Sequence, residues 1–152
     1  MRKKEKEVTD QTAIEAIIQD AAVCRLGLVD NGEPYIVPMN FGYSNGRLFF
    51  HSAKEGRKLD VIRSSSRVCF ELESGVEVIG AEKPCGWTTR FSSVIGYGRA
   101  YIVEDAEEKK AGLDVIMRHY AGPGDFAYPP VTLEKTAIIL VEVESMTAKR
   151  SE

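Results

Sequence analysis

A short segment near the middle of the chain combines residue types that bind anions. It reads His51-Ser52-Ala53-Lys54-Glu55-Gly56-Arg57-Lys58 and follows the apolar residues Leu48-Phe49-Phe50. Where a strand leads into a helix, backbone N–H groups and the positive end of the helix dipole attract anions. Arg57 and Lys58 would occupy the first helical turn, where the dipole disfavours each cation by roughly 0.3–1 kcal/mol. An anion held between them and the helix end would remove that conflict, because arginine offers a planar fork and lysine a point charge.

A simpler interpretation of the same residues stays open. Ser52 and Glu55 have the spacing of a capping box, in which case Arg57 and Lys58 would only form a solvated helix face. Such a helix would contain Gly56, at a cost of about 1 kcal/mol relative to alanine. A glycine is easier to explain where the backbone comes close to a ligand. The segment is therefore compatible with an anion site and with an ordinary helix start.

The other reactive side chains do not form a recognisable catalytic set. His51 could face a ligand or water, and His119 suits the C-terminal end of a helix dipole. Trp87 could anchor the core or cover a planar ligand. Cys85 is expected to be structural, because no histidine partner is evident nearby. We find no nucleophile–base pair and no metal cluster, and Gly96-Tyr97-Gly98-Arg99 has only two of the three glycines of the dinucleotide fingerprint.

Hydrophobic spacing predicts the elements that would position this segment. Helices are predicted over about 10–22, 56–64 and 105–120. Strands are predicted over 23–29, 35–43, 47–51, 67–73, 76–79, 92–103 and 137–144. Thr12 with Glu15 and Asp105 with Glu108 have the spacing of capping boxes. Six or seven strands with three peripheral helices indicate a mainly β fold, a closed antiparallel barrel, because closure removes exposed strand edges.

Turn-forming residues refine this arrangement. Asn45-Gly46 predicts a two-residue hairpin turn of type I′, in which both residues have positive φ. Pro38 cannot donate to a strand ladder, so it indicates an edge or a bulge. Ser74-Gly75 predicts a turn between two strands. The glycines Gly96 and Gly98, inside a long strand pattern, indicate a bend or the close approach of another group.

Length and composition limit the function classes. A chain of 152 residues with 43% hydrophobic and 28% charged residues suits one globular domain over 1–152. The net charge of −3 argues against general nucleic-acid binding. Cys24, Cys69 and Cys85 form no Cys-x-x-Cys pair, so they indicate neither a disulfide framework nor zinc. The charged start 1–7 resembles a solvated end more than a signal or membrane segment, so we expect a cytoplasmic protein without membrane contact.

Several longer stretches carry a resemblance to a known family. They are Pro34–Tyr43, Leu48–Ala53 with Gly56-Arg57-Lys58, Cys85–Gly98 and Met117-Arg118-His119-Tyr120. In their order and spacing, the chain resembles the FMN-binding split-barrel proteins related to pyridoxamine 5′-phosphate oxidase, and most closely the nitroimidazole-resistance (Nim-type) branch. The resemblance extends from about Asp10 to Val143.

The resemblance implies a homodimer with two FMN sites at the subunit interface. Arg57 and Lys58 would bind the flavin phosphate with Ser52 beside them, and Trp87 to Val94 would reach the flavin from the partner subunit. The strand around Asn40 would line the isoalloxazine ring. The positions that the resemblance assigns to the cofactor are Met39, Asn40, Phe41, His51, Ser52, Arg57, Lys58, Trp87, Ser92, Ser93 and Val94.

The same resemblance sets expectations about activity. True pyridoxamine 5′-phosphate oxidases carry an Arg- and His-containing C-terminal segment, and residues 146–152 offer nothing comparable, so vitamin B6 oxidation is not expected. We expect a reductase that passes electrons from a reduced nicotinamide to a small aromatic, nitroimidazole-like acceptor, with His51 as the catalytic candidate. Two alternatives stay open: a non-catalytic flavin-binding or redox-sensing protein, and a haem-binding split barrel that would use His51 or His119.

Overall fold

The structure is a computed structural model and describes residues 3–151. Eight strands form one antiparallel sheet: β1 (Glu7–Val8), β2 (Cys24–Asp30), β3 (Glu33–Met39), β4 (Phe41–Ser44), β5 (Arg47–Ala53), β6 (Arg67–Ile79), β7 (Thr88–Val103) and β8 (Thr136–Ser151). The helices are α1 (Gln11–Asp20), α2 (Arg57–Ser64), α3 (Ala106–Ala121) and α4 (Pro130–Lys135), with 3-10 turns at Lys4–Lys6 and Pro84–Gly86. The expected mainly β class with peripheral helices is confirmed.

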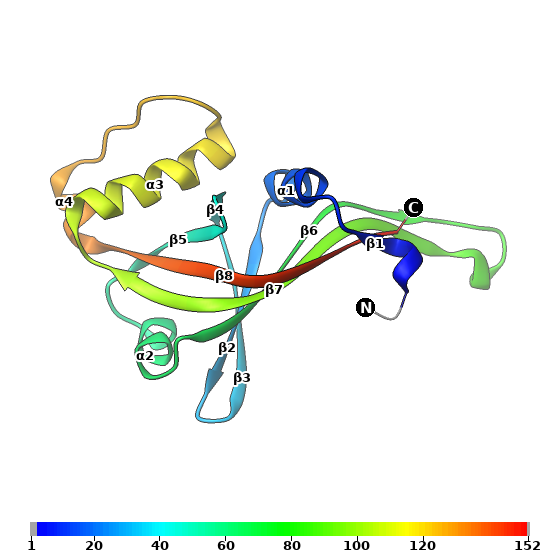
Figure 1. Cartoon of the computed structure of the whole chain (residues 1–152), viewed down its shortest axis with the longest axis horizontal. Coiled ribbons are helices and arrows are strands. Elements are labelled where there is room, and N and C mark those ends of the chain that lie inside the picture. The colour runs from blue at the N-terminus through cyan, green and yellow to red at the C-terminus, as the bar shows by residue number, and fades with distance from the viewer. Residues whose placement is uncertain (1–2, 152) are drawn as a thin grey trace.

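The strands follow the order β3-β2-β6-β7-β8-β5-β4, and β1 adds beside β8 (Figure 1). β3 and β4 each pair with one neighbour, so hydrogen bonds do not close the barrel, and the expected closure is wrong. Both edges are poor partners for another strand. β3 contains Pro34 and Pro38, which lack an N–H, and β4 is four residues long. Pro38 on an edge strand is as the sequence indicates.

The hydrophobic core lies inside the curved sheet, beneath α1 and α2. Alternate residues of the strands point inward, and the largest side chains among them, Phe41, Phe50 and Phe70, are at most 1% exposed. α3 covers the opposite face of β4, β5 and β8 (Figure 1). It packs so closely that a methyl group on Gly42 would lie 2.5 Å from the Val115 carbonyl oxygen.

The starts of α1 and α3 are capped by aspartates. Asp105 accepts hydrogen bonds from the backbone N–H groups of Glu107 and Glu108, which confirms the predicted cap of α3. In α1 the prediction is wrong. Asp10 accepts from the backbone N–H of Ala13, and Thr12 lies inside the helix. An aspartate two residues earlier offers the same oxygen with a charge that the helix dipole favours.

The turn predictions have mixed outcomes. Asn45 and Gly46 have φ values of 49° and 75°, which confirms the type I′ hairpin. Ser74-Gly75 is not a turn: β6 continues through it, and the pairing with β7 shifts register between Ser74 and Glu77. Gly75, at φ 61°, accommodates this bulge. Because the chain reverses only at 80–87, β6 and β7 form a long hairpin arm that projects from the rest of the molecule (Figure 1).

Segments near both ends of the chain form elements that the sequence patterns did not predict. Residues 1 and 2 of the charged N-terminal start lie outside the described residues. From Lys4 onward this start is not a loose end, because β1 pairs with β8 and Lys6 Nζ donates to Ser151 Oγ. α4 is also unpredicted. None of the helices within residues 3–151 has the length and apolar character needed to cross a bilayer.

The end of α3 is fastened to two other elements by Tyr120. Its hydroxyl accepts from the Phe41 N–H at 3.0 Å and donates to the Ala22 carbonyl at 2.8 Å. Tyr120→Phe should lower the free energy of unfolding by about 1–2 kcal/mol, because it leaves the N–H of a buried residue without a partner. Urea denaturation measures this. Tyr97→Phe is the control, since the structure gives that exposed hydroxyl no partner within residues 3–151, and equal losses in both variants would contradict the prediction.

Candidate functional site

The anion-binding segment begins where β5 ends and crosses a short loop into α2. Gly56 is the N-cap of α2, with φ 131° and ψ 161°, a conformation that favours glycine. A side chain there would meet no atom within 4 Å, so the helix start opens onto free space. Arg57 and Lys58 are the first two residues of the helix, as predicted. Their backbone N–H groups belong to the first turn, which lacks intrahelical acceptors.

Ser52, four residues before Gly56, is buried. It is the second-last residue of β5, it is 7% exposed, and its hydroxyl has no hydrogen-bond partner within the described residues. The capping-box interpretation of Ser52 and Glu55 is therefore wrong, because Gly56 is the cap and Ser52 belongs to the strand. A buried polar group without a partner costs about 1–3 kcal/mol. A ligand oxygen at this position would supply the missing partner.

Arg57 is oriented by two residues that the sequence patterns did not single out. Its Nε donates to Asp30 Oδ2 at 2.8 Å, and its guanidinium carbon lies 4.2 Å from the centre of the Tyr35 ring. These contacts fix the plane of the guanidinium. Within residues 3–151, neither terminal Nη atom of Arg57 contacts a hydrogen-bond acceptor. Both can therefore donate to a ligand.

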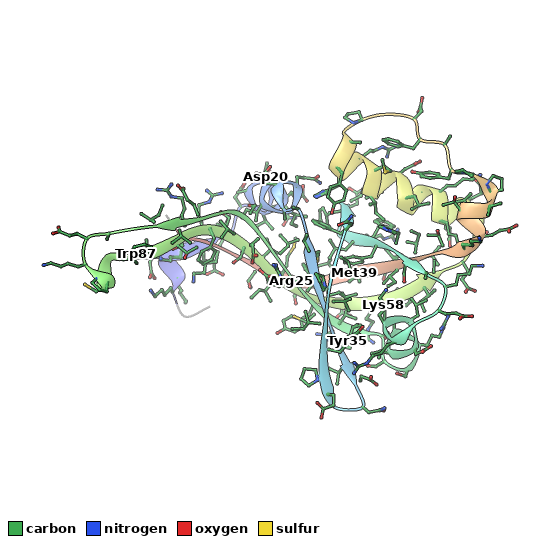
Figure 2. All side chains as sticks on the ribbon, turned by 180° about the vertical axis from the view of Figure 1, so that it is seen from behind. Asp20, Arg25, Tyr35, Met39, Lys58 and Trp87 are labelled. Atoms are coloured by element: carbon green, nitrogen blue, oxygen red, sulfur yellow. The ribbon has the colours of Figure 1, made fainter. Side chains whose placement is uncertain are left out.

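Lys58 supplies the second charge. Its side chain is half-buried, and it forms no ion pair with any residue of the described chain. Asp30 neutralises part of the Arg57 charge, whereas nothing described offsets Lys58. Figure 2 shows Lys58 and Tyr35 at the same end of the molecule. The helix start and the two cations together form a surface suited to a phosphate dianion.

The predicted ring-lining residues between β3 and β4 differ in exposure. Asn40, between the two strands, is exposed, and Met39 is half-buried against the core. Phe41 is 0% exposed, and its ring centre lies 4.4 Å from that of His119. Phe41 therefore supports the core, while Asn40 and Met39 reach the surface.

His51 points away from Ser52. Side chains alternate along β5, so Ser52 faces the core side and His51 is exposed on the opposite face. His51 pairs with Ile138, on the face of the sheet that α3 covers, where Gly112 of α3 packs within contact distance of Ile138. Within one chain, the structure does not bring the His51 ring and the Ser52 hydroxyl together.

The predicted residues on the hairpin arm lie far from the segment. Trp87 is at the tip of the arm, 59% exposed, with its Nε1 donating to the Ala81 carbonyl at 2.8 Å. Figure 2 shows Trp87 at the opposite end of the molecule from Lys58. Val94 is 0% exposed and belongs to the core, and Ser93 is half-buried. Contacts between the tip of the arm and the anion-binding segment would therefore need a second copy of the chain.

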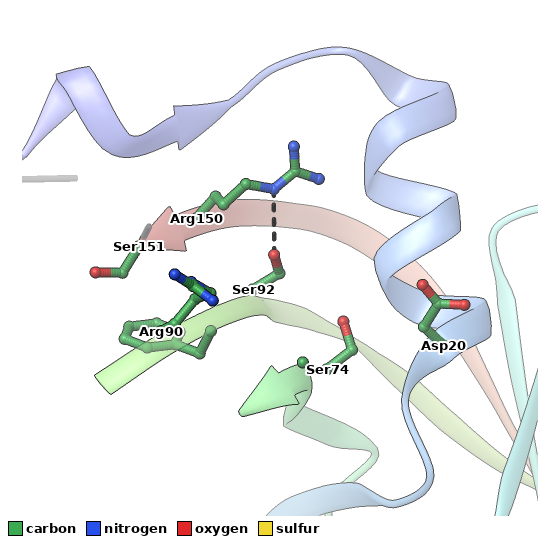
Figure 3. A pocket seen from close by; sticks show the side chains of 8 residues that line it. Asp20, Ser74, Arg90, Ser92, Arg150 and Ser151 are labelled. Atoms are coloured by element: carbon green, nitrogen blue, oxygen red, sulfur yellow. Dashed lines mark hydrogen bonds between the residues drawn. The ribbon is translucent and has the colours of Figure 1, made fainter. Parts of the chain in front are cut away.

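Ser92 opens into a cleft of about 560 Å³ at the base of the arm (Figure 3). The cleft holds two cationic side chains, Arg90 and Arg150, and the carboxylate of Asp20 at its edge. Arg150 Nε donates to Ser92 Oγ at 3.2 Å. Arg90 pairs with Glu77 at 2.9 Å. This cleft is the second place where predicted cofactor residues meet charged groups.

An acid pair that the sequence patterns missed lies on the outer face of β2 and β6. Arg25 contacts both Glu71 and Glu73 at 3.1 Å. Burial and the neighbouring Glu73 carboxylate raise the pKa of Glu71 above its ordinary value, and Arg25 opposes them. Arg25 and Glu71 also border a small hollow of about 250 Å³ between β3 and β6. Side chains alternate along β6, which places both carboxylates on one face of the sheet. That Arg25 lies between them follows only from the pairing of β2 with β6.

The two histidines are placed differently for ligand binding. His119 Nε2 donates to the Ala21 carbonyl at 2.7 Å, and its Nδ1 is buried without a partner in the described chain. His119 thus holds α3 to the end of α1, and an axial role toward haem would first have to break that contact. Within residues 3–151, no group of three or more His, Cys, Asp or Glu side chains could hold a metal ion.

Comparisons with known proteins identify the fold and the family of the chain. The chain is 35% identical to a proposed 5-nitroimidazole antibiotic resistance protein from Bacteroides thetaiotaomicron, with a TM-score of 0.83 over 96% of this chain and 90% of that one. The FAD- and haem-binding protein of Mycobacterium smegmatis shares the fold at 17% identity, with a TM-score of 0.85 over 97% and 74% of the two chains.

A curated relative covers less of the chain. Mitochondrial intermediate peptidase 1 of Cryptococcus neoformans is 33% identical over 88 residues, which are 56% of this chain and 11% of that protein. The chain thus spans about a tenth of that protein's length. The family model of pyridoxamine 5′-phosphate oxidase, in contrast, matches residues 10–150. The expected resemblance is confirmed, and the chain belongs to the pyridoxamine 5′-phosphate oxidase family.

Proposed function

We propose that the protein binds FMN, with the flavin phosphate on the start of α2. Two observations carry the proposal: the start of α2 bears Arg57 and Lys58, and the buried Ser52 hydroxyl, four residues before the N-cap Gly56, has no partner within residues 3–151. A phosphate dianion would accept from that hydroxyl and from the backbone N–H groups, and it would lie between two cations. Met39 and Asn40 would then contact the ring system.

Replacing Ser52 tests the fit directly. Ser52→Ala should raise the free energy of unfolding of the FMN-free protein by up to about 1 kcal/mol, because it removes an unpaired buried hydroxyl. It should also weaken FMN binding about tenfold. Chemical denaturation and flavin titration measure the two effects. Ser64→Ala is the control, because that hydroxyl bonds to the Val61 carbonyl in the same helix. An unchanged FMN affinity in Ser52→Ala would refute the role of the hydroxyl.

We infer that two copies of the chain complete each site. The arm extends beyond its own chain's core and exposes Val76, Val78 and Trp87 at 57%, 65% and 59%. Isolated apolar side chains are common on surfaces, but a projecting hairpin that carries three of them fits a partner contact. The Ser92 cleft would then face the partner's flavin. Analytical ultracentrifugation should give the mass of a dimer, and a monomer at micromolar concentration would contradict this inference.

We further propose that the flavoprotein acts as a reductase in the cytoplasm. Bound FMN would supply hydride or electron transfer from a reduced nicotinamide to a small aromatic acceptor. The 35% identity to a proposed 5-nitroimidazole resistance protein supports a nitroaromatic acceptor. The protein would hold the flavin, shield it from water and orient the acceptor. Stopped-flow mixing with NADH and NADPH separates this proposal from a flavin store, in which neither donor would reduce the bound flavin.

His51 is proposed to orient the acceptor, because it is an exposed histidine and the first residue of the anion-binding segment. His51→Ala should lower kcat/KM for nitroaromatic acceptors about tenfold, as expected for the loss of one positioning hydrogen bond. FMN affinity should stay within about twofold of wild type, since the ring faces away from Ser52. Turnover equal to that of the wild type for every accepted nitroaromatic compound would remove His51 from the mechanism.

A further inference from the structure

Another cavity lies between α3 and α4. It has a volume of about 430 Å³, within the range of about 300–1,000 Å³ that small-molecule pockets occupy. Its lining residues are Lys54, Glu104, Ala106, Lys109, Lys110, Tyr128, Pro130, Leu133 and Glu134. Figure 1 shows α3 and α4 together at one end of the molecule. Lys54 belongs to the anion-binding segment, but none of these residues is proposed to contact FMN.

Lys109 is the unusual member of this lining. It is 3% exposed, and a lysine is almost never so buried unless it is paired. No carboxylate within residues 3–151 lies close enough to form an ion pair with it. Its Nζ donates to the Leu133 carbonyl at 3.0 Å, and that carbonyl already accepts from the Thr136 N–H. An ammonium group has three donors, so one shared carbonyl leaves most of its hydrogen-bonding capacity unused.

The other charges around the cavity do not compensate Lys109. Lys110 pairs with Glu107 at 3.1 Å. Glu104 and Glu134 are exposed, so water screens their carboxylates. Lys54 is exposed and forms no ion pair within the described residues. A buried cation without a counterion is costly, and an anionic ligand would offset that cost.

The remaining lining residues of the cavity indicate that the anionic ligand would have an apolar part. Ala106, Pro130 and Leu133 are apolar, and Tyr128 lines the cavity while its hydroxyl donates to Asp114. We propose that this cavity binds a small organic carboxylate, whose charged end bonds to the Lys109 ammonium and whose apolar body lies against Leu133, Pro130 and Ala106. Inorganic phosphate lacks such a body and should bind more weakly.

A structural role for Lys109 is the competing explanation, because its ammonium group, reaching across from α3, also interacts favourably with the last carbonyls of α4. The two roles differ in their dependence on ligand. A structural lysine would affect stability with or without an anion, whereas a binding lysine makes anion affinity depend on residue 109.

The test uses benzoate as the probe, with benzamide as the neutral isostere and inorganic phosphate as the anion without an apolar body. Amide NMR of the full chain, with and without FMN, should show saturable benzoate shifts at Ala106, Lys110 and Leu133. Lys109→Met should weaken benzoate binding at least about tenfold, as expected for a lost charge-assisted contact. Lys83→Met, which removes a lysine charge from the hairpin arm far from this cavity, should bind benzoate as the wild type does. Equal binding of benzoate by Lys109→Met would overturn the proposal.

The remaining outcomes are also decisive. If Lys109→Met does not fold, the wild type alone decides, because benzamide must bind at least about tenfold more weakly than benzoate. Benzoate shifts that are absent or lie elsewhere, and phosphate binding without benzoate binding, each contradict the proposal. If the protein does not bind FMN, the proposed function fails but the benzoate test still decides this inference, since the benzoate shifts are also measured without FMN.

Discussion

Replacing both Arg57 and Lys58 with alanine is expected to weaken FMN binding at least about a hundredfold. Each phosphate contact made by a charged side chain contributes about 1.5–3 kcal/mol, and 1.4 kcal/mol corresponds to a factor of about ten. The lower end of that range applies, because the Arg57 side chain is 56% exposed and already shares its charge with Asp30. Titration of FMN fluorescence against the double variant measures the loss.

Arg63→Ala is the matched control for this experiment. Arg63 lies on the same helix and pairs with Asp60 at 3.3 Å, so its removal takes away a cation without touching the helix start. FMN affinity should be unchanged in this variant. An affinity of the double variant close to that of the wild type would show that the phosphate does not lie at Arg57 and Lys58.

Gly98→Ala is expected to cost about 3 kcal/mol of folding free energy, at the upper end of the usual overpacking range. A methyl group at this position would lie 2.2 Å from the Glu142 carbonyl oxygen and 3.1 Å from Val141 Cγ1. Both contacts belong to β8, which pairs with β7 on either side of Gly98. Because the obstructing atom is backbone, a rotamer change cannot relieve the clash, and the two central strands must separate.

Equilibrium unfolding in urea measures this loss, with Gly124→Ala as the control. The atoms nearest to a methyl group on Gly124 would be those of the Phe126 ring, at 3.4 Å, which is an ordinary contact with a movable side chain. The control should stay within about 0.5 kcal/mol of wild type. If Gly98→Ala is as stable as Gly124→Ala, then β7 and β8 are not packed as closely as the structure has them.

Local sequence signals predicted the elements well where the physics is local. The Asn45-Gly46 turn depends on two positive φ values, and the amphipathic helices depend on spacing within a few turns. The fold class followed from these elements. The Ser74-Gly75 signal failed because glycine with positive φ serves a bulge as well as a turn, and pairing with β7 decided between them. Barrel closure failed because it depends on whether the distant strands β3 and β4 meet.

The candidate site was predictable only in part, because some of its contacts join residues that are distant in the sequence. Arg57 and Lys58 at the start of α2 follow from sequence order. The contacts of Arg57 with Asp30 and Tyr35 join residues more than 20 positions apart, and no spacing rule predicts them. Ser52 was interpreted as a cap because strand and helix boundaries are uncertain by a few residues. Its burial, which now supports the ligand site most strongly, became visible only with the fold.

The most direct test of the phosphate site compares FMN with riboflavin on the wild-type protein. The two flavins share the ring system and differ by the phosphate. If the start of α2 anchors that phosphate, FMN should bind at least about a hundredfold more tightly than riboflavin, and the difference should shrink in the Arg57/Lys58 double variant. Equal affinities for the two flavins, or no saturable binding of FMN, would contradict the assignment of the segment from His51 to Lys58 as the flavin anchor.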